Sequence, residues 1–152
     1  MSNEPIDLMP FCDTDGQRGD FDLRAPFVRD GHRYATNARI CVRVPTTDTE
    51  LPTDRKVPSR PGDLFREFPA TCRFRHLPTP ENVSVWCPDC GGAVLARMPV
   101  QIGQSRYAGA AIDLIRELPD VAFAKPRGKE GNLYFIAAGG LQGILAALSE
   151  GE

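Results

Sequence analysis

A Cys-Pro-Asp-Cys-Gly-Gly segment at residues 87–92 constrains the fold of this chain more than any other stretch, because it supplies half of a tetrahedral metal site. Structural zinc ions take four ligands, which are Cys or His side chains in most proteins. Cys87 and Cys90 have the two-residue spacing of a metal-binding turn. The two glycines that follow permit positive φ angles and let backbone amides approach the sulfurs.

The other half of the site must come from elsewhere in the chain. Upstream, the segment 72–76 adds a Cys and a His, which gives the spacing C-x3-H-x10-C-x2-C. Four protein ligands would close the coordination sphere, so the zinc would be structural. Cys41 or Cys12 could replace the His. The predicted ligands are Cys72, His76, Cys87 and Cys90.

Two other interpretations of these cysteines stay open. Cys72 could be a small buried hydrophobic residue. Cys87 and Cys90 could form a redox pair, but such pairs usually begin a helix, and Gly91-Gly92 disfavour a helix there. If zinc is present, its apparent binding energy of roughly 10 kcal/mol would order residues 68–93, an insert with little apolar content. Fixing each residue of that insert costs about 1–2 kcal/mol.

Composition indicates an ordinary soluble globular protein. The chain has 152 residues, 25% charged and 41% hydrophobic, with a formal net charge of −2. We expect one domain over residues 1–152, with residues 1–19 as a loosely ordered N-terminal arm. Five cysteines, no visible signal segment and no apolar run of membrane-spanning length predict a reducing, cytoplasmic location.

Alternating apolar and polar residues over 21–45 predict a twisted hairpin of half-buried strands. In the first half, Phe21, Leu23, Ala25 and Phe27 alternate with Asp22, Arg24 and Pro26; in the second, Ile40, Val42 and Val44 alternate with Arg39, Cys41 and Arg43. Asp30-Gly31 is a strong turn signal between them. We expect Thr36-Asn37-Ala38 to break or bend the second strand.

One amphipathic helix is predicted over residues 105–118, with Ser105 as its N-cap and Pro119 ending it. The proline-rich stretch 45–63 predicts a loop, with a helical turn at 62–67. Short extended pieces are expected around Val83, Val85 and 94–98, and strands at 121–124 and 132–136. Residues 141–148 fit either an edge strand or a helix. The fold class is therefore α+β, with a mainly antiparallel sheet and the helix across one face.

Arginines in the strand regions could share one sheet face and contact phosphates, because strand residues two apart point the same way. The alternative is a solvated face balanced by acids. The candidate nucleic-acid-binding residues are Arg24, Arg39, Arg43, Arg73 and Arg75.

No catalytic constellation stands out. The acidic turn at 13–16 and His32, next to the Asp30-Gly31 turn, are the only starting points for an enzyme, and both are typical of solvated turns. No nucleophile elbow, phosphate-binding glycine loop or zinc-protease motif is present in the sequence. We therefore expect no enzymatic activity and assign no catalytic residue.

Two regions resemble domains of the bacterial DNA sliding clamp, the beta subunit of the replicative polymerase. DGHRYATNARICVRVP, at 30–45, resembles a signature strand region of the clamp, and the succession of a helix at 105–118, a hairpin at 121–136 and a strand at 141–148 resembles its end. The chain is also similar to small bacterial and phage proteins with a cysteine-rich insert. The resemblance implies an α+β fold and a strand at 141–148. It carries over no functional residue.

The function expected from the sequence is that of a non-enzymatic binding or scaffold protein, clamp-like and associated with DNA transactions. A protein partner is expected, nucleic acid is a possible partner, and no membrane is expected. The alternatives are direct nucleic-acid binding through the arginine face and a small enzyme of unknown reaction. Salt dependence of binding separates the first alternative from a scaffold, and a concave pocket with converging titratable groups would indicate the second.

Overall fold

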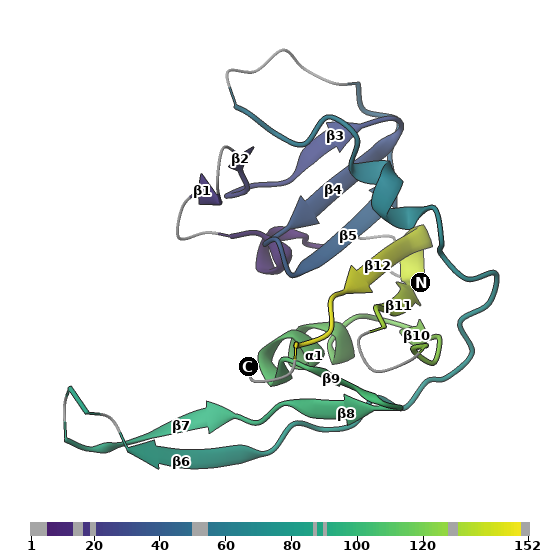
Figure 1. Cartoon of the computed structure of the whole chain (residues 1–152). Helices are drawn as coiled ribbons and strands as arrows, with labels where there is room; N and C mark the ends of the chain where they lie inside the picture. Colours follow the sequence, from purple (N-terminus) through teal and green to yellow (C-terminus); the bar gives the residue numbers. More distant parts are fainter. Residues whose placement is uncertain are drawn as a thin grey trace.

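The computed structural model describes residues 6–13, 17–18, 21–49, 55–86, 88–89, 91–127 and 131–149. Figure 1 shows the arrangement of the elements. The first half contains η1 (Met9–Phe11), β1 (Gln17–Arg18), β2 (Phe21–Asp22), β3 (Phe27–Arg29), β4 (His32–Thr36), β5 (Ile40–Pro45) and η2 (Pro61–Phe65). The second half contains β6 (Asn82–Trp86), β7 (Ala93–Arg97), β8 (Val100–Ile102), β9 (Ser105–Tyr107), α1 (Gly109–Arg116), β10 (Ala122–Phe123), β11 (Leu133–Ala137), η3 (Ala138–Gly140) and β12 (Leu141–Leu145).

A six-stranded antiparallel sheet, in the order β10-β11-β12-β5-β4-β3, forms the centre of the molecule. The C-terminal strand β12 lies between β11 and β5, so it joins the two ends of the chain into one sheet. The predicted α+β class with a mainly antiparallel sheet is confirmed. The open choice for residues 141–148 is settled as strand over Leu141–Leu145.

The predicted turns of the first region are confirmed, but the region forms three paired strands and not one simple hairpin. Asp30 and Gly31 have φ angles of 48° and 76° and connect β3 to β4. The Thr36-Asn37-Ala38 segment ends β4. There the Thr36 hydroxyl donates to the Ile40 carbonyl at 2.7 Å, and the Asn37 Oδ1 accepts from two backbone amides.

The two faces of the central sheet bury different side chains. On one face, alternate residues such as Val42, Phe135 and Leu145 join Ile112 and Ile115 of α1 in the main hydrophobic core. The period-2 alternation of strand side chains places Cys41 and Ile144 on the opposite face. These two residues belong to a smaller cluster, the aromatic cluster, with Phe27, Tyr34 and Phe65.

The segment that carries η2 covers the second sheet face. Phe65 packs edge-on against Tyr34, with ring centroids 6.1 Å apart, and Phe68 does the same against Tyr134 at 5.3 Å. Figure 1 shows η2 crossing in front of the sheet beside β5. The face that the strand pattern predicts to be wet is therefore partly buried.

The predicted helix begins four residues later than the sequence indicates. Its apolar stripe is confirmed, because Ala111, Ile112 and Ile115 are buried. Ser105, however, does not cap it, because Ser105–Tyr107 form β9 and pair with β8. The buried Ser105 hydroxyl accepts a bond from the Gly131 amide at 3.1 Å. No helix in the described ranges has the length and apolar content that crossing a bilayer requires.

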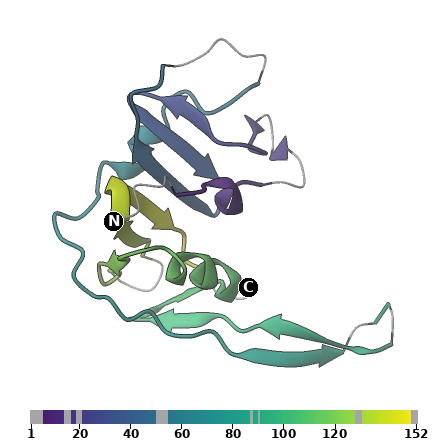
Figure 2. The same cartoon turned by 180° about the vertical axis from the view of Figure 1, so that it is seen from behind.

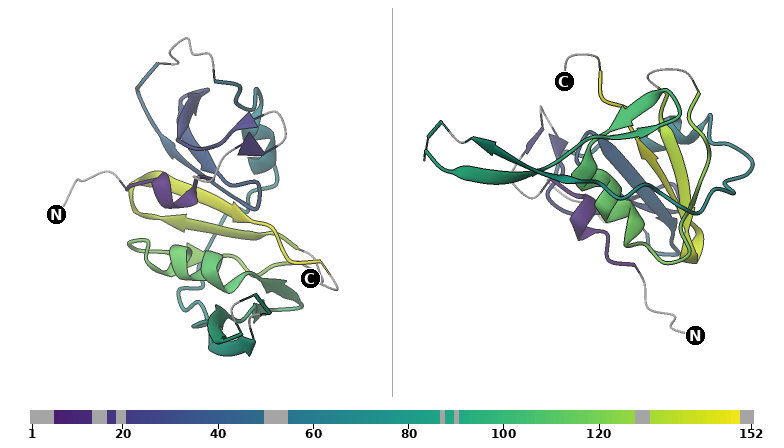
Figure 3. Two further views of the ribbon diagram at one scale, coloured as in Figure 1. Left: turned by 90° about the vertical axis from the view of Figure 1, so that its left-hand side faces the viewer. Right: turned by 90° about the horizontal axis from the view of Figure 1, so that it is seen from below.

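Strands β6 and β7 form a separate two-stranded ribbon, which we call the arm. Three views show it projecting from the rest of the molecule (Figures 1, 2 and 3). Its base is anchored to α1 by an ion pair between Arg97 and Asp113 at 2.8 Å. Close packing adds to this anchor, since a Cβ atom at Gly109 would lie 2.4 Å from the Met98 carbonyl oxygen.

Candidate functional site

The four predicted zinc ligands are only partly described by the structure. Cys72 lies on the segment between η2 and β6, where its thiol contacts the Tyr134 carbonyl oxygen at 3.9 Å. Burial raises the pKa of this thiol. His76 is exposed further along the same segment.

Cys87 and Cys90 lie outside the described residues. The strands that lead to them, β6 and β7, run away from the body of the protein (Figure 1). No three His, Cys, Asp or Glu side chains of the described residues converge as metal ligands. The zinc ion and its ligand set therefore stay a prediction.

The reserve ligands Cys12 and Cys41 are packing residues in this structure. The Cys12 thiol lies 3.7 Å from the Leu8 carbonyl oxygen within the main core, and burial raises its pKa. Cys41 lies in the aromatic cluster, where burial raises its pKa to about 12. Both thiols are therefore part of the packed interior.

Arg24 is held by a carboxylate. Its Nε and Nη2 donate to the two oxygens of Asp22 at 2.9 and 3.0 Å. These bonds hold the pKa of Asp22 well below its usual range and raise that of Arg24. Arg55 also pairs with Asp22 and donates to the Pro26 and Ala25 carbonyls. This group fixes the chain around β2 and β3.

Arg43 is also committed to the interior. Its Nε donates to Gln142 at 3.0 Å and its Nη1 to the Tyr34 hydroxyl at 3.2 Å. The guanidinium lies over the Phe65 ring, 4.1 Å from the centroid. Such cation–π contacts stabilise partly buried arginines. Arg43 therefore joins β5 to its neighbours and to the segment that covers them.

The remaining candidate arginines lie outside the strands of the sheet. Arg39 is exposed in the bend before β5. Arg73 and Arg75 are exposed on either side of Phe74. The five candidates are thus distributed over several elements, and Arg43 alone among them lies on a sheet strand.

Phe74 attaches the segment between η2 and β6 to the free edge of β10. Its amide donates to the Phe123 carbonyl at 3.0 Å, and the Phe123 amide donates back at 2.7 Å. This is an isolated antiparallel bridge between residues far apart in the sequence. The arginines on each side of Phe74 therefore lie at a sheet edge and not on a sheet face.

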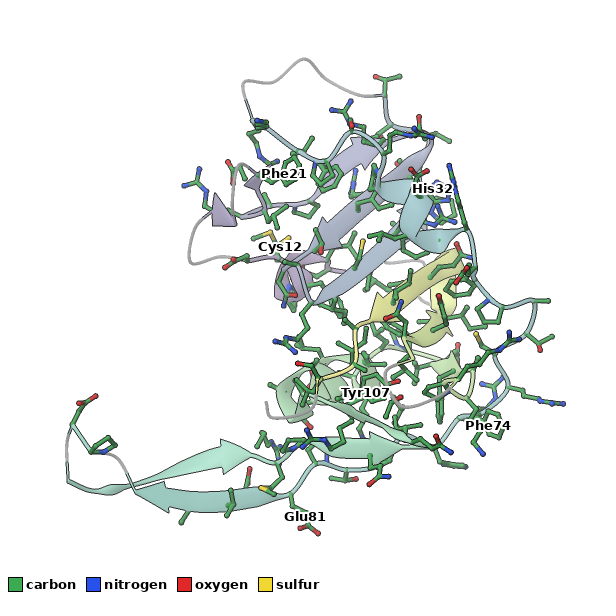
Figure 4. All side chains as sticks on the ribbon, in the orientation of Figure 1. Cys12, Phe21, His32, Phe74, Glu81 and Tyr107 are labelled. Carbon is green, nitrogen blue, oxygen red and sulfur yellow. The ribbon has the colours of Figure 1, made fainter. Side chains whose placement is uncertain are left out.

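The Phe74 side chain is only partly covered. Its ring lies 5.7 Å from that of Phe123, at an angle of 35°. Phe123 is buried, whereas Phe74 is 45% exposed. Figure 4 shows Phe74 at the margin of the molecule, well away from Tyr107 in the interior. One side of an aromatic ring is thus packed while much of it meets solvent.

Positive charge concentrates around this edge although the whole chain has a net charge of −2. The bridged segments 68–80 and 121–127 contain four Lys or Arg residues and no Asp or Glu. Acids occur only at their borders, at Glu67, Glu81 and Asp120. All four cations are exposed. We call this group the basic edge; it consists of Arg73, Phe74, Arg75, Lys125 and Arg127.

The two starting points for an enzyme, the acidic turn at 13–16 and His32, form no catalytic arrangement among the described residues. The His32 ring nitrogen Nδ1 lies 3.2 Å from the Asp30 carbonyl oxygen, a contact within the turn. Its ring is 6.0 Å from that of Tyr34. Asp13 is described, but residues 14–16 of the acidic turn lie outside the described ranges.

No protein-family model, curated protein or solved structure matches this chain. The resemblance to sliding-clamp domains therefore stays an expectation from the sequence. The geometry adds two features that sequence reasoning missed, namely the projecting arm and the pairing of Phe74 with Phe123. The Arg-Phe-Arg pattern at 73–75 was a signal for the contact made by Phe74, because it places an apolar side chain between two cations.

Proposed function

We propose that this chain is a non-enzymatic binding protein whose basic edge contacts the phosphates of nucleic acid. The observation that carries the proposal is the concentration of four exposed cations, without acids, on two segments that the Phe74–Phe123 bridge brings together. Lys and Arg side chains supply most of the sequence-independent affinity for nucleic acid. Arg73 and Arg75 take part in this site, whereas Arg24 and Arg43 stabilise the fold.

The proposal predicts a defined dependence of affinity on salt. Neutralising Z phosphates of a single strand gives a slope of log affinity against log salt of about −0.7Z. Four cations therefore give a slope of about −2.8, and affinity falls about 50-fold between about 50 and 200 mM salt. The measurement is fluorescence anisotropy with a labelled oligothymidine of about 16 nucleotides.

A charge-matched pair of variants tests the location of the site. Arg73→Gln combined with Arg75→Gln leaves two cations, so the slope falls to about −1.4 and the salt effect to about 7-fold. Arg33→Gln combined with Arg116→Gln removes the same charge from β4 and α1, where both arginines make ion pairs with Asp residues. This control keeps the original slope. Equal effects in the two double variants, or no binding by the parent chain, would refute the proposal.

A second candidate function, that of a protein-binding scaffold, is favoured by the arm. Two large hydrophobic residues of the arm are exposed, namely Val83 on β6 and Met98 at the base of the arm, directly after β7. An isolated two-stranded ribbon is only marginally stable in water, so a partner that covers it would stabilise it. Native mass spectrometry reports bound metal and assembly state together. If the chain is a monomer, and if Val83→Thr and Met98→Gln change neither its assembly state nor its stability, the result would count against self-association through the arm.

A further inference from the structure

The basic edge contains a feature that phosphate binding does not require, namely the exposed aromatic ring between its two arginines. Phosphates are contacted by cations and polar groups. A half-exposed Phe contributes nothing to that contact and leaves apolar surface in water. The Phe74 ring can therefore contact a different part of a ligand from Arg73 and Arg75.

From this arrangement we infer that the basic edge binds single-stranded nucleic acid, with an unpaired base stacked on the Phe74 ring. The inference rests on the proposed function and names its substrate class. Proteins that bind single strands combine a basic track with aromatic side chains on which bases stack. In a duplex the base faces are already stacked on one another and cannot reach the ring.

The structure holds Phe74 ready for this contact. Both of its backbone hydrogen-bonding groups are bonded to Phe123, at 3.0 and 2.7 Å. The buried Phe123 ring supports it from one side, with the centroids 5.7 Å apart. An aromatic ring fixed before binding loses little conformational entropy when a ligand stacks on it.

The cations flank this ring along the chain and across the bridge. Arg73 and Arg75 are its immediate neighbours. Lys125 follows Phe123 by two residues, and the antiparallel bridge brings it to the same edge as Arg73. A strand that crosses the bridge at Phe74 therefore meets Arg73 and Arg75 on one segment and Lys125 on the other. Single-strand sites of this kind tolerate any base, because every base has a π face.

The test compares Phe74→Leu with the parent chain on oligothymidine and on a duplex of equal length. Leucine retains apolar contact with Phe123 and removes the aromatic face. We expect single-strand affinity to fall about 5- to 150-fold at fixed salt, with little change for the duplex. The slope against salt stays at its parent value, because no charge is removed. Phe74→Trp, which retains a stacking surface, binds the single strand at least as well as the parent.

The outcomes separate this inference from the proposed function. If the parent chain binds with the expected salt slope but Phe74→Leu binds equally well, stacking is refuted and phosphate contact stands. If the duplex binds as tightly as the single strand, the substrate class is wrong. If polyglutamate binds the basic edge as tightly as the oligonucleotide, the site recognises acidic polypeptides and both proposals fail. Circular dichroism of each variant verifies that its fold is intact.

Discussion

Gly143 is the position at which the packing of the central sheet can be tested most sharply. It lies in β12, is buried, and pairs with Phe135 of β11. The Phe135 ring covers the space that a side chain at 143 would occupy. An alanine methyl there would lie 2.1, 2.3 and 2.7 Å from three ring carbons of Phe135.

Two effects of opposite sign decide the result of Gly143→Ala. Gly143 has no positive φ angle, so alanine would stabilise the strand by about 0.5–1 kcal/mol through the unfolded chain if space allowed. Overpacking a filled core costs about 1–3 kcal/mol. Contacts near 2 Å with a fully buried ring belong at the upper end of that range, so we expect a net loss of about 2 kcal/mol.

A double-mutant cycle identifies the ring as the cause. Phe135→Leu shortens the side chain and alone costs about 1–3 kcal/mol. In that background, Gly143→Ala meets less obstruction, so the two changes couple by about 1–2 kcal/mol. Urea unfolding followed by circular dichroism gives the free energies of unfolding. The loss from Gly143→Ala also lowers Tm by about 4–8 °C. A variant as stable as the parent, or strictly additive changes, would show that Phe135 does not lie over β12 in this way.

Three further expectations follow from the titratable groups and the cysteines. Since Arg24 lowers the pKa of Asp22, the Arg24–Asp22 pair stabilises the fold fully above the ordinary carboxyl pKa near 4 and less as the pH falls below it. In thermal melts over that acidic range, Asp22→Asn should therefore lose less stability than the parent chain. Burial raises the pKa of Tyr107 to about 12, so the protonated hydroxyl stabilises the fold fully below pH about 10, and this stabilisation is lost as the pH rises toward 12. In alkaline thermal melts, Tyr107→Phe should therefore lose less stability over that interval than the parent chain. Native mass spectrometry should find one zinc ion per chain, absent from Cys87→Ala and retained in Cys12→Ala; an apo, folded parent chain would refute the zinc site.

The sequence predicted those parts of the fold in which local pattern and burial agree. The alternation of Ile40, Val42 and Val44 identified β5, and the stripe containing Ile112 and Ile115 identified the buried face of α1. In each case one face of an element packs on the main core, so hydrophobic periodicity reports the contact directly. The turn at Asp30-Gly31 was equally local.

The errors arise where contacts between distant residues decide the outcome. Ser105 has the chemistry of an N-cap, but its hydroxyl bonds to Gly131 and its backbone belongs to the β8–β9 pair. Arg43 has the alternation of a solvated strand residue, but the segment carrying Phe65 covers it. Neither partner can be located from local sequence, because the two contacts join residues 26 and 22 positions apart and no periodicity links them.

The candidate site shows the same division. Arg73 and Arg75 were recognised as possible phosphate ligands from residue type alone. Their grouping with Lys125 in the basic edge depends on the Phe74–Phe123 bridge, which closes a loop of about fifty residues. Closing a loop of that length is an entropic cost that only the folded sheet edge offsets.

The arm leads to a final prediction about what a zinc ion would stabilise. Its base is fixed by the Arg97–Asp113 ion pair, whereas Val83 and Ser84, further along β6, are exposed. A two-stranded ribbon of this kind is only marginally stable in water. An ion bound by Cys87 and Cys90 would therefore stabilise the arm before any other part of the chain. Cys72 is also a predicted ligand and lies two residues before Phe74, so removing zinc with a chelator should accelerate amide hydrogen exchange in β6 and β7 and at Phe74, and should weaken oligothymidine binding. If chelation leaves the Phe74 amide protected and binding unchanged, Cys72 is not a ligand and the ion orders the arm alone.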